Sequence, residues 1–308
     1  MSKRFAAGAI GAAFLSTILI AQQPVVRTGD PIKRGMQLTD FPRTVKVARN
    51  VYTYEDFHAG PEKFTTTNLF VVTADGVLVA DGQGSPAETK GLVDAIRRVT
   101  PKPITTVVIA SDHGDHTAGN ASFPAGVHYI IHPTSKAILE QARSGWKPPA
   151  DAELVADKKT ITMGSEEMEI LFLGRSHTGG DLAVWLPREQ ILFLSETYLN
   201  RVFPAMRSAY PTEWLKALDR AEAMKASVYI AGHGFTETGP VSQEEIRAYH
   251  NAMVAVIAEA TRLYQDGVTV DQAIAQANFG EYGSWTLAAS QGPIAIRKVY
   301  EELSGQLK

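Results

Sequence analysis

The sequence predicts an α/β fold in which two β-sheets pack face to face and helices cover the outside. Two observations lead to this fold class. Short β-branched or apolar segments alternate along the chain with segments whose apolar residues recur at helical spacing. Several of the β-branched segments are continuously apolar, which indicates strands that are buried on both faces. Two sheets packed together, with helices outside, would bury the strands in this way.

Nothing in the sequence divides this fold into parts. The chain has no linker rich in Pro, Gly or Ser, and it has no repeat of fixed period. We therefore expect a single domain over residues 42–308, preceded by a loose polar lead-in over residues 22–41.

The composition excludes several classes of protein. With 44% hydrophobic and 20% charged residues, the 308-residue chain is typical of a soluble globular protein. Its 30 basic and 33 acidic residues give a net charge of −3, so nucleic acid is not an expected partner. A small-molecule substrate is expected instead, and the oligomeric state is left open. Because the chain contains no cysteine, any metal must be held by His, Asp and Glu.

Residues 1–21 are expected to be an export signal. Lys3 and Arg4 precede an uncharged segment that ends at Ala21, a small residue at the expected cleavage position. The segment is at the short limit for a membrane span, which needs about 20 apolar residues, so we favour cleavage over an uncleaved anchor. A periplasmic or secreted protein without stable membrane association follows. The lack of cysteine suits such an oxidising compartment.

In the first half of the chain, strands outnumber helices. Alternation of apolar and polar residues marks the first strand, and an Asp75-Gly76 turn signal separates the next two. Apolar residues three and four positions apart mark the helices. The expected elements are a strand over 45–54, two strands within 68–80, a helix over 86–99, strands over 104–110 and 127–131, and a helix over 134–143.

The second half of the chain begins with strands and ends in helices. Pro187 closes one of the strands, and proline opens two of the helices, at Pro211 and Pro293. The expected strands cover 160–173, 182–186, 191–194 and 228–231, and the expected helices cover 211–224, 242–265, 270–277 and 293–303.

A cluster of potential metal ligands directly follows the buried strand over 104–110. His113, Asp115 and His116 fall within four residues, in a turn that contains glycine. A strand end fixes the backbone of such a turn, and imidazole and carboxylate together are typical zinc ligands. Packing is a poor explanation for the cluster, because it would gather three polar side chains without partners. The sequence therefore predicts a metal site at this turn.

Three further candidates lie at comparable strand ends. His177 lies in a glycine-rich turn before an expected strand, whereas Glu196 and His233 each follow one. Taken alone, each of them is more readily explained as a structural or surface residue. Taken together with the cluster, they form a second set of potential ligands.

The order of these residues resembles the metallo-β-lactamase superfamily over nearly the whole chain after the expected signal. Members carry a His-x-His-x-Asp-His stretch after a buried strand, then a Gly-His-Thr-type turn, a strand ending in Gly-Asp and a strand ending in Gly-His. The resemblance implies a four-layer αββα sandwich, a single metallo-hydrolase domain with zinc at one edge. It also implies a first metal site with His113 and His177, a second with Asp115, His116 and His233, and Glu196 in the bridging position.

Two departures from the family pattern affect the first site. Ser111 stands where the first His of the stretch is expected, and a neutral hydroxyl is a poor zinc ligand, although Ser111 could hold a water that contacts the metal. Glu196 stands in place of an Asp that is one methylene shorter. We therefore expect one firmly bound zinc at the second site, and a zinc at the first site that is weak or depends on substrate. The pattern is most similar to the cysteine-free branch of the β-lactamases, in which some members carry Ser at the first position.

Together with the expected export signal, these ligands predict an exported zinc hydrolase. Zinc lowers the pKa of a bound water from 15.7 to about 7, and the resulting hydroxide would attack a carbonyl carbon. Asp115 or Glu196 would orient the water and accept its proton. The candidate substrates are a β-lactam amide, a lactone, or another small ester or thioester. Arg201 or Arg207 could hold a substrate carboxylate, although solvation at the surface is the simpler role for either.

Aromatic residues near the potential ligands could form a wall of the substrate pocket. The candidates are Phe57, Tyr198, Phe203 and Tyr210. The alternative is that these rings pack in the core, and we favour it because aromatic residues dominate protein cores.

Two other classes of function stay open. Ser111 and Glu196 could be losses, in which case the protein is a non-catalytic metal- or ligand-binding descendant of the fold. Alternatively, some relatives of this fold hold two irons and carry out redox chemistry. The missing first His and the lack of a flavin-type domain speak against the redox class. Zinc content without turnover would favour the first alternative, and iron in place of zinc would favour the second.

Overall fold

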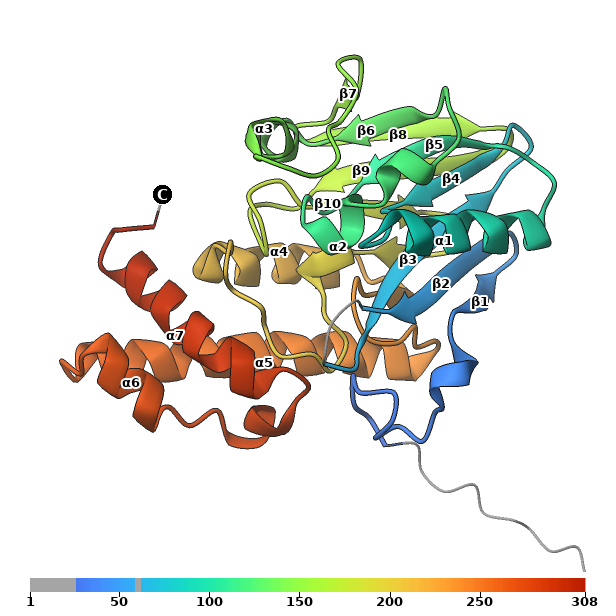
Figure 1. Cartoon of the computed structure of the whole chain (residues 1–308). Helices are drawn as coiled ribbons and strands as arrows, with labels where there is room; N and C mark the ends of the chain where they lie inside the picture. The colour runs from blue at the N-terminus through green and yellow to red at the C-terminus, as the bar shows by residue number, and fades with distance from the viewer. Residues whose placement is uncertain (1–25, 59–61, 308) are drawn as a thin grey trace, which may run out of the picture.

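The computed structural model describes residues 26–58 and 62–307 and contains two β-sheets (Figure 1). The first sheet has seven strands in the order β1-β2-β3-β4-β5-β6-β7. Strands β1 to β4 pair antiparallel, whereas β4 to β7 pair parallel. The carboxyl ends of β4 and β5 therefore meet at one edge. The strands are β1 (Arg43–Ala48), β2 (Val51–Phe57), β3 (Thr65–Val72), β4 (Val77–Ala80), β5 (Ile104–Ile109), β6 (His128–Ile131) and β7 (Glu153–Leu154).

The second sheet has five strands in the order β12-β11-β10-β9-β8. All its pairs are antiparallel except β11 with β12, which are parallel and are connected through helix α4 (Pro211–Ala223). The carboxyl ends of β11 and β12 therefore also meet at one edge. The strands are β8 (Lys158–Met163), β9 (Glu166–Phe172), β10 (Leu182–Leu186), β11 (Ile191–Phe193) and β12 (Val228–Ile230).

The two sheets face each other across an apolar interior. Leu78 and Val108 from the first sheet are buried together with Ile170, Val184 and Phe193 from the second. Burial of such side chains contributes about 25 cal/mol per Å² of apolar surface, so this interior holds the two sheets together.

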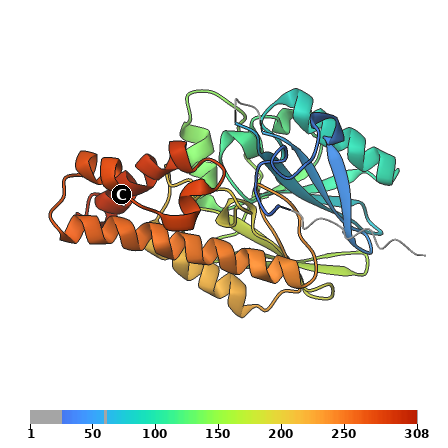
Figure 2. The same cartoon turned by 90° about the horizontal axis from the view of Figure 1, so that it is seen from below.

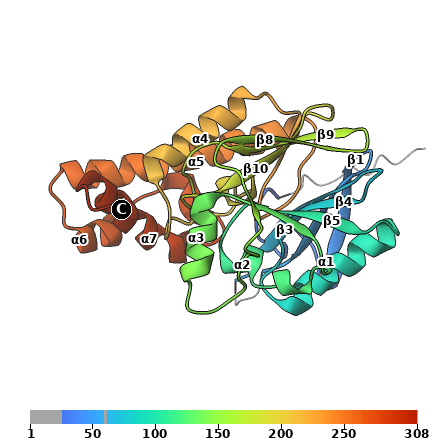
Figure 3. The same ribbon diagram turned by 90° about the horizontal axis from the view of Figure 1, so that it is seen from above.

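Helices cover both outer faces, as the views along the layers show (Figures 2 and 3). Helix α1 (Pro86–Val99) packs Leu92 and Ile96 against the seven-stranded sheet. Helices α4 and α5 (Pro240–Gln265) cover the five-stranded sheet, and α7 (Ala288–Leu303) packs against α5. Trp214, Tyr249 and Ile296 from these three helices belong to one buried cluster. The predicted α/β sandwich with helices outside is therefore confirmed.

Local sequence explains where α1 begins and ends. The Ser85 side chain accepts a hydrogen bond from the Glu88 backbone N–H at 3.3 Å, and Pro86 occupies the first turn. Arg97 and Arg98 lie in the last turn, where cations interact favourably with the helix dipole. The helix has the bounds that the sequence predicts.

Three expected elements are corrected by the structure. The segment 45–54 is a hairpin, with Asn50 in the left-handed region at φ 65° between β1 and β2. The segment 160–173 likewise turns at Gly164, where φ is 61°. Alternation continues through such tight turns, so periodicity alone does not reveal them. Helix α7 begins at Ala288 and contains Pro293, rather than beginning at that proline.

Three short helices complete those labelled in Figure 1, namely α2 (Gly114–Thr117), α3 (Pro133–Gln141) and α6 (Val270–Gln276). Helix α3 starts one residue before its expected range.

The expected export signal over residues 1–21 lies outside the described residues. Within the described part of the chain, no helix has the length and apolar character of a membrane span. Of the lead-in, residues 26–41 are described, and two of their arginines form ion pairs with the rest of the chain. Arg27 Nη1 lies 2.6 Å from Glu244 Oε2, and Arg34 Nη2 lies 2.5 Å from Glu237 Oε1. These ion pairs attach the lead-in to α5 and to the loop before it.

Candidate metal centre

The potential ligands lie at the edge where the carboxyl ends of β4, β5, β11 and β12 come together. His113, Asp115 and His116 follow β5, Glu196 follows β11, and His233 follows β12. A backbone hydrogen bond of 2.8 Å from Thr67 N–H to Gly232 O ties β3 of the first sheet to the chain after β12. Two sheets therefore contribute side chains to one site.

Asp81, which directly follows β4, holds three parts of this edge in place. Its Oδ1 accepts backbone hydrogen bonds from Ala110 at 2.7 Å and Ser111 at 3.2 Å. Its Oδ2 accepts from Ser195 Oγ at 2.5 Å and lies 3.1 Å from His116 Nδ1. Both Asp81 and Ser195 have positive φ, at 63° and 45°. The buried carboxylate thus fixes the end of β5, the loop after β11 and the ring of His116.

Asp181 fixes the turn that carries His177. Its carboxylate accepts hydrogen bonds from Ser176 Oγ at 2.6 Å, from Thr178 N–H at 2.6 Å and from Thr178 Oγ1 at 2.7 Å. The His177 ring packs edge-on against Trp214, with a centroid separation of 5.3 Å. The turn before β10 therefore presents one ring nitrogen of His177 to the centre of the site.

Glycines on either side of His233 allow it to enter the site. A Cβ at Gly232 would lie 2.6 Å from the backbone of Ser195, and a Cβ at Gly234, where φ is 92°, would lie 2.2 Å from a neighbouring backbone oxygen. Only glycine is accommodated at such distances. His233 Nδ1 donates to Thr65 O at 2.9 Å, so Nε2 is the nitrogen that faces the other ligands.

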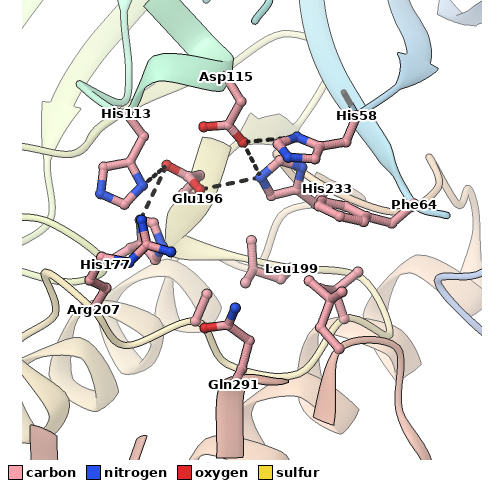
Figure 4. A pocket seen from close by; sticks show the side chains of 13 residues that line it. His58, Phe64, His113, Asp115, His177, Glu196, Leu199, Arg207, His233 and Gln291 are labelled. Carbon is pink, nitrogen blue, oxygen red and sulfur yellow. Dashed lines mark hydrogen bonds and ion pairs between the residues drawn. The ribbon is translucent and has the colours of Figure 1, made fainter. Parts of the chain in front are cut away.

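Four of the expected residues converge at the second site (Figure 4). His233 Nε2 lies 3.2 Å from Asp115 Oδ2, 3.2 Å from Glu196 Oε1 and 3.4 Å from His116 Nε2. His116 Nε2 lies 3.9 Å from each of the same two carboxylate oxygens. The second site thus has two imidazoles and two carboxylates around a common point.

At the first site, three side chains converge on the other oxygen of Glu196. Glu196 Oε2 lies 3.3 Å from His113 Nδ1 and 3.2 Å from His177 Nδ1. It also accepts a hydrogen bond of 2.5 Å from Ser111 Oγ. Ser111 Oγ in turn accepts from the His113 backbone N–H at 3.3 Å. The structure therefore gives the Ser111 hydroxyl a direct partner, Glu196. A metal contact of Ser111 through a water stays a prediction.

The two groups of ligand atoms fit zinc. Ligands bound to one tetrahedral zinc at about 2.0–2.1 Å lie about 3.3 Å apart, close to the separations around His233 Nε2. His177 Nδ1 is buried but has no hydrogen-bond partner among the described residues, although Glu196 Oε2 is 3.2 Å away. A buried ring nitrogen that faces a carboxylate without bonding to it suits a cation between them. Imidazole and carboxylate are also the donors that zinc prefers when thiolates are absent.

Opposite charges dominate the electrostatics of this cluster. Burial opposes the positive charge of His113 and His233, but the neighbouring carboxylates outweigh it and raise the pKa of His113 to about 9 and of His233 to about 10. Burial would raise the pKa of Glu196, but His177 and His113 hold it well below its usual range. Burial and Glu196 would raise the pKa of Asp115, but His116 and His233 hold it low as well. Both carboxylates are therefore ionised at neutral pH.

We expect the thermal stability of the metal-free protein to fall as the pH rises from about 7 to about 10. The pKa values of His113 and His233 in the folded state, about 9 and about 10, lie above the ordinary imidazole value of about 6.5. The stabilisation is therefore complete below about pH 6.5 and is lost as the pH rises through these folded-state values. Melting curves recorded in excess chelator measure this loss. Zinc-saturated protein is the control and should vary less, because zinc displaces these protons. A metal-free melting temperature that stays constant or rises over this range would contradict the assignment.

The expected aromatic wall is corrected by the structure. Tyr198 and Phe203 are buried in the cluster beneath α4, α5 and α7. Phe57 packs against Phe41, with ring centroids 4.6 Å apart, and Tyr210 lies under the guanidinium of Arg175. None of the four expected residues lines the pocket at the potential ligands. Tyr198 and Phe203 thus follow the alternative of core packing, because large rings bury more apolar area there than at the pocket surface. Phe57 and Tyr210 are half-buried.

The pocket has a volume of about 170 Å³ and includes residues that sequence reasoning did not assign to it. His58 Nδ1 lies 3.3 Å from Asp115 Oδ2, and the His58 ring stacks on Phe64 at 4.4 Å. His58 lies in the segment between β2 and β3, outside the pattern of His and Asp residues that indicated the other members of the site. Arg207 lines the pocket, whereas Arg201 binds Glu245 through two hydrogen bonds. The remaining wall residues are Leu199, Val202, Ala205, Leu287 and Gln291.

Comparison with known proteins places this site in a family context. A family model described as the metallo-beta-lactamase superfamily matches residues 63–233. This region contains every potential ligand at the two sites.

Three known proteins illustrate what this chain is similar to. Metallo-beta-lactamase IND-1 of Chryseobacterium indologenes is 25% identical over 64% of this chain and 84% of its own length. The 2,4-dinitroanisole O-demethylase subunit alpha of Nocardioides sp. (strain JS1661) is 23% identical over 72% of this chain and 66% of its own length. The structure of the inverting sec-alkylsulfatase Pisa1 from Pseudomonas sp. superposes with a TM-score of 0.68 at 16% identity, over 88% of this chain and 52% of that one. The matches thus span less than two thirds of the demethylase and of the sulfatase.

Proposed function

This chain belongs to the metallo-beta-lactamase superfamily, and from that membership we propose that it is an exported, zinc-dependent hydrolase of a small carbonyl substrate. The proposed substrate is a β-lactam amide, a lactone, or another small ester or thioester. One observation carries the proposal, namely that each oxygen of Glu196 faces a separate pair of imidazoles.

The potential metal ligands form two groups that share Glu196. His113, His177 and Glu196 Oε2 would hold one zinc, and Asp115, His116, His233 and Glu196 Oε1 would hold the other. When bound, zinc supplies Lewis-acid activation of a water molecule near neutral pH. We expect the second group to bind more firmly because it offers four donors, compared with three in the first.

Asp115 and Glu196 have different proposed roles. The Glu196 side chain is 4% exposed, and both of its oxygens are occupied by neighbouring side chains. The Asp115 side chain is 19% exposed and lines the pocket. We therefore assign Glu196 to holding the two groups together, and Asp115 to orienting the attacking water and accepting its proton.

The residues that line the pocket favour a small substrate that has an apolar part and an anionic group. Phe64, Leu199 and Val202 give the pocket an apolar side. Arg207 is exposed at the pocket and makes no hydrogen bond or ion pair with any residue that the structure describes. Its guanidinium is therefore available to a substrate carboxylate, which planar guanidinium binds through two parallel hydrogen bonds.

We expect hydrolysis that depends on zinc. The protein without residues 1–21 is purified, its zinc per chain is measured, and turnover is tested with nitrocefin, a lactone, a thioester and an ester. Complete chelation should abolish turnover of the preferred substrate, and added zinc should restore it. Turnover that persists after complete removal of zinc would contradict the proposal. Bound zinc without turnover of any substrate would favour a non-catalytic binding protein, and iron in place of zinc would favour the redox alternative.

Ether cleavage is a second candidate. The relative named as a 2,4-dinitroanisole O-demethylase subunit covers 72% of this chain, a larger share than the 64% covered by IND-1. 2,4-Dinitroanisole therefore belongs in the same panel of substrates. Release of 2,4-dinitrophenol from it, with no turnover of the carbonyl substrates, would favour this candidate over the first.

The proposed place of action is the periplasm or the exterior of the cell. The basic start and the uncharged segment over residues 5–21 support it, as does the absence of cysteine from the sequence. Cell fractionation, with mass determination of the mature amino terminus, tests it. An intact amino terminus in the membrane fraction would indicate an uncleaved anchor instead.

A further inference from the structure

Part of the pocket wall comes from the C-terminal helices, outside the region that the family model matches. Leu287 and Gln291, at the start of α7, line the same pocket as Asp115 and His233. In Figure 4, Gln291 lies on the opposite side of the pocket from Asp115. The family match ends at residue 233, so this part of the wall is a feature of the chain beyond the matched region.

Leu287 has a backbone conformation that leucine rarely adopts. Its φ of 70° and ψ of 1° lie in the left-handed region, where a Cβ is unfavourable and glycine is relaxed. Leu287 O accepts a hydrogen bond from Gln291 N–H at 2.8 Å, and Thr286 O accepts one from Phe203 N–H at 2.8 Å. These backbone bonds would form with any side chain at position 287. The hydrogen bonding of the turn therefore does not require leucine, and strain of this kind is typical of functional sites.

The Leu287 side chain is half-buried between the C-terminal core cluster and the pocket. On the pocket side it adds to the apolar surface formed by Leu199 and Val202. The Gln291 side-chain amide makes no hydrogen bond within the described part of the chain, and it points into the pocket (Figure 4). This corner of the pocket thus offers an apolar surface beside one free amide group.

We infer that Leu287 is a specificity-determining residue that limits the length of the apolar chain that a substrate can place against α7. The inference rests on the proposed function, because it concerns the substrate of the same site. The ligand class is a short alkyl or acyl chain attached to the group that reacts. Leucine at this position closes the pocket, and a smaller residue would leave room for additional methylene groups.

Leu287→Gly is the direct test, because glycine relaxes the backbone at this φ while it removes the side chain. Turnover is measured with p-nitrophenyl acetate, butyrate, hexanoate and octanoate. We expect the ratio of kcat/KM for hexanoate to that for acetate to rise about tenfold in the variant, since each further methylene that is buried favours binding several-fold. Leu287→Ala, which keeps the strained backbone, should shift the ratio in the same direction. An unchanged chain-length profile in both variants would overturn the inference.

Lys225→Gly is the matched control. Lys225 also has a positive φ, at 53°, but it is exposed after α4 and does not line the pocket. Its substitution by glycine should leave the chain-length profile unchanged. A shift equal to that of Leu287→Gly would show that general loosening, and not the pocket wall, is the cause.

A binding measurement separates this inference from the proposed function. The rise in melting temperature of zinc-loaded protein is measured with acetate, butyrate, hexanoate and octanoate. In the Leu287→Gly variant, the melting temperature should keep increasing up to longer carboxylate chains than it does in the unmodified protein. If this shift occurs while no β-lactam, lactone, thioester or ester is hydrolysed, the proposed function fails and the inference stands. If esters are hydrolysed with equal profiles and no shift occurs, the inference fails and the proposed function stands.

Discussion

Glu196→Gln is expected to remove bound zinc from both sites and to lower hydrolysis by roughly 10³-fold or more. Glu196 is the only residue that belongs to both groups of potential ligands among the described residues. Its charge is balanced by imidazoles on both sides, so a neutral amide leaves those imidazoles without their shared partner. The measurement is zinc per chain after dialysis at limiting zinc, together with kcat/KM on the preferred substrate.

A second readout of Glu196→Gln does not depend on activity. Glu196 raises the pKa of His113 and His233 in the metal-free protein, so their values should move toward the ordinary imidazole range in the variant. The loss of stability between about pH 7 and 10 should become smaller. Glu166→Gln is the matched control, because Glu166 is also a buried carboxylate with a cationic partner, Arg188, but lies away from the site. The control should keep its zinc and its activity. Retention of both zinc ions by Glu196→Gln would refute its role as shared ligand.

His233→Ala is expected to remove the firmly bound zinc, whereas His113→Ala should lower only the occupancy of the weaker site. His233 Nε2 has three potential ligand atoms within 3.4 Å, while His113 belongs to the group with fewer donors. Loss of partners outside the ligand shell already costs about 10–100-fold in metal affinity, so removal of a direct ligand should weaken zinc binding by more than about 100-fold. Zinc affinity is measured by competition with a coloured chelator.

The control for these two variants is His128→Ala. His128 is an exposed histidine that pairs with Glu153 at 2.9 Å, away from the potential ligands. The His128→Ala variant should bind zinc with the same affinity as the unmodified protein. If His233→Ala keeps a tightly bound zinc and His113→Ala loses it, the order of affinity between the two sites is the reverse of the one proposed.

Local patterns explain why part of the site could be predicted from the sequence. His113, Asp115 and His116 occur within four residues at a strand end, so their proximity follows from chain connectivity alone. The caps and apolar spacing of α1 are local in the same sense. His177, Glu196 and His233 are far apart in sequence. Their positions at strand ends indicated further potential ligands, but only the resemblance to a family with the same order of residues assigned them to particular metal sites.

Contacts between distant segments explain what could not be predicted. The hydrogen bond between Ser111 and Glu196 joins residues 85 positions apart, and no local pattern indicated that the hydroxyl would meet the carboxylate. Tyr198 and Phe203 have the same sequence appearance whether they line a pocket or fill a core, and burial decides between the two. Leu287 reaches the pocket only because the segment before α7 pairs with the loop after β11, where Val202 bridges Thr286.

The position of bound zinc relative to Glu196 tests the account most directly. Crystals of the zinc-soaked protein are measured at the zinc absorption edge, and the anomalous difference map is calculated. The account predicts a strong peak within bonding distance of Glu196 Oε1, Asp115, His116 and His233, and a second peak, weaker at low zinc, beside Glu196 Oε2, His113 and His177. A map without a peak at the first of these positions, or with zinc bound only elsewhere on the protein, would contradict it.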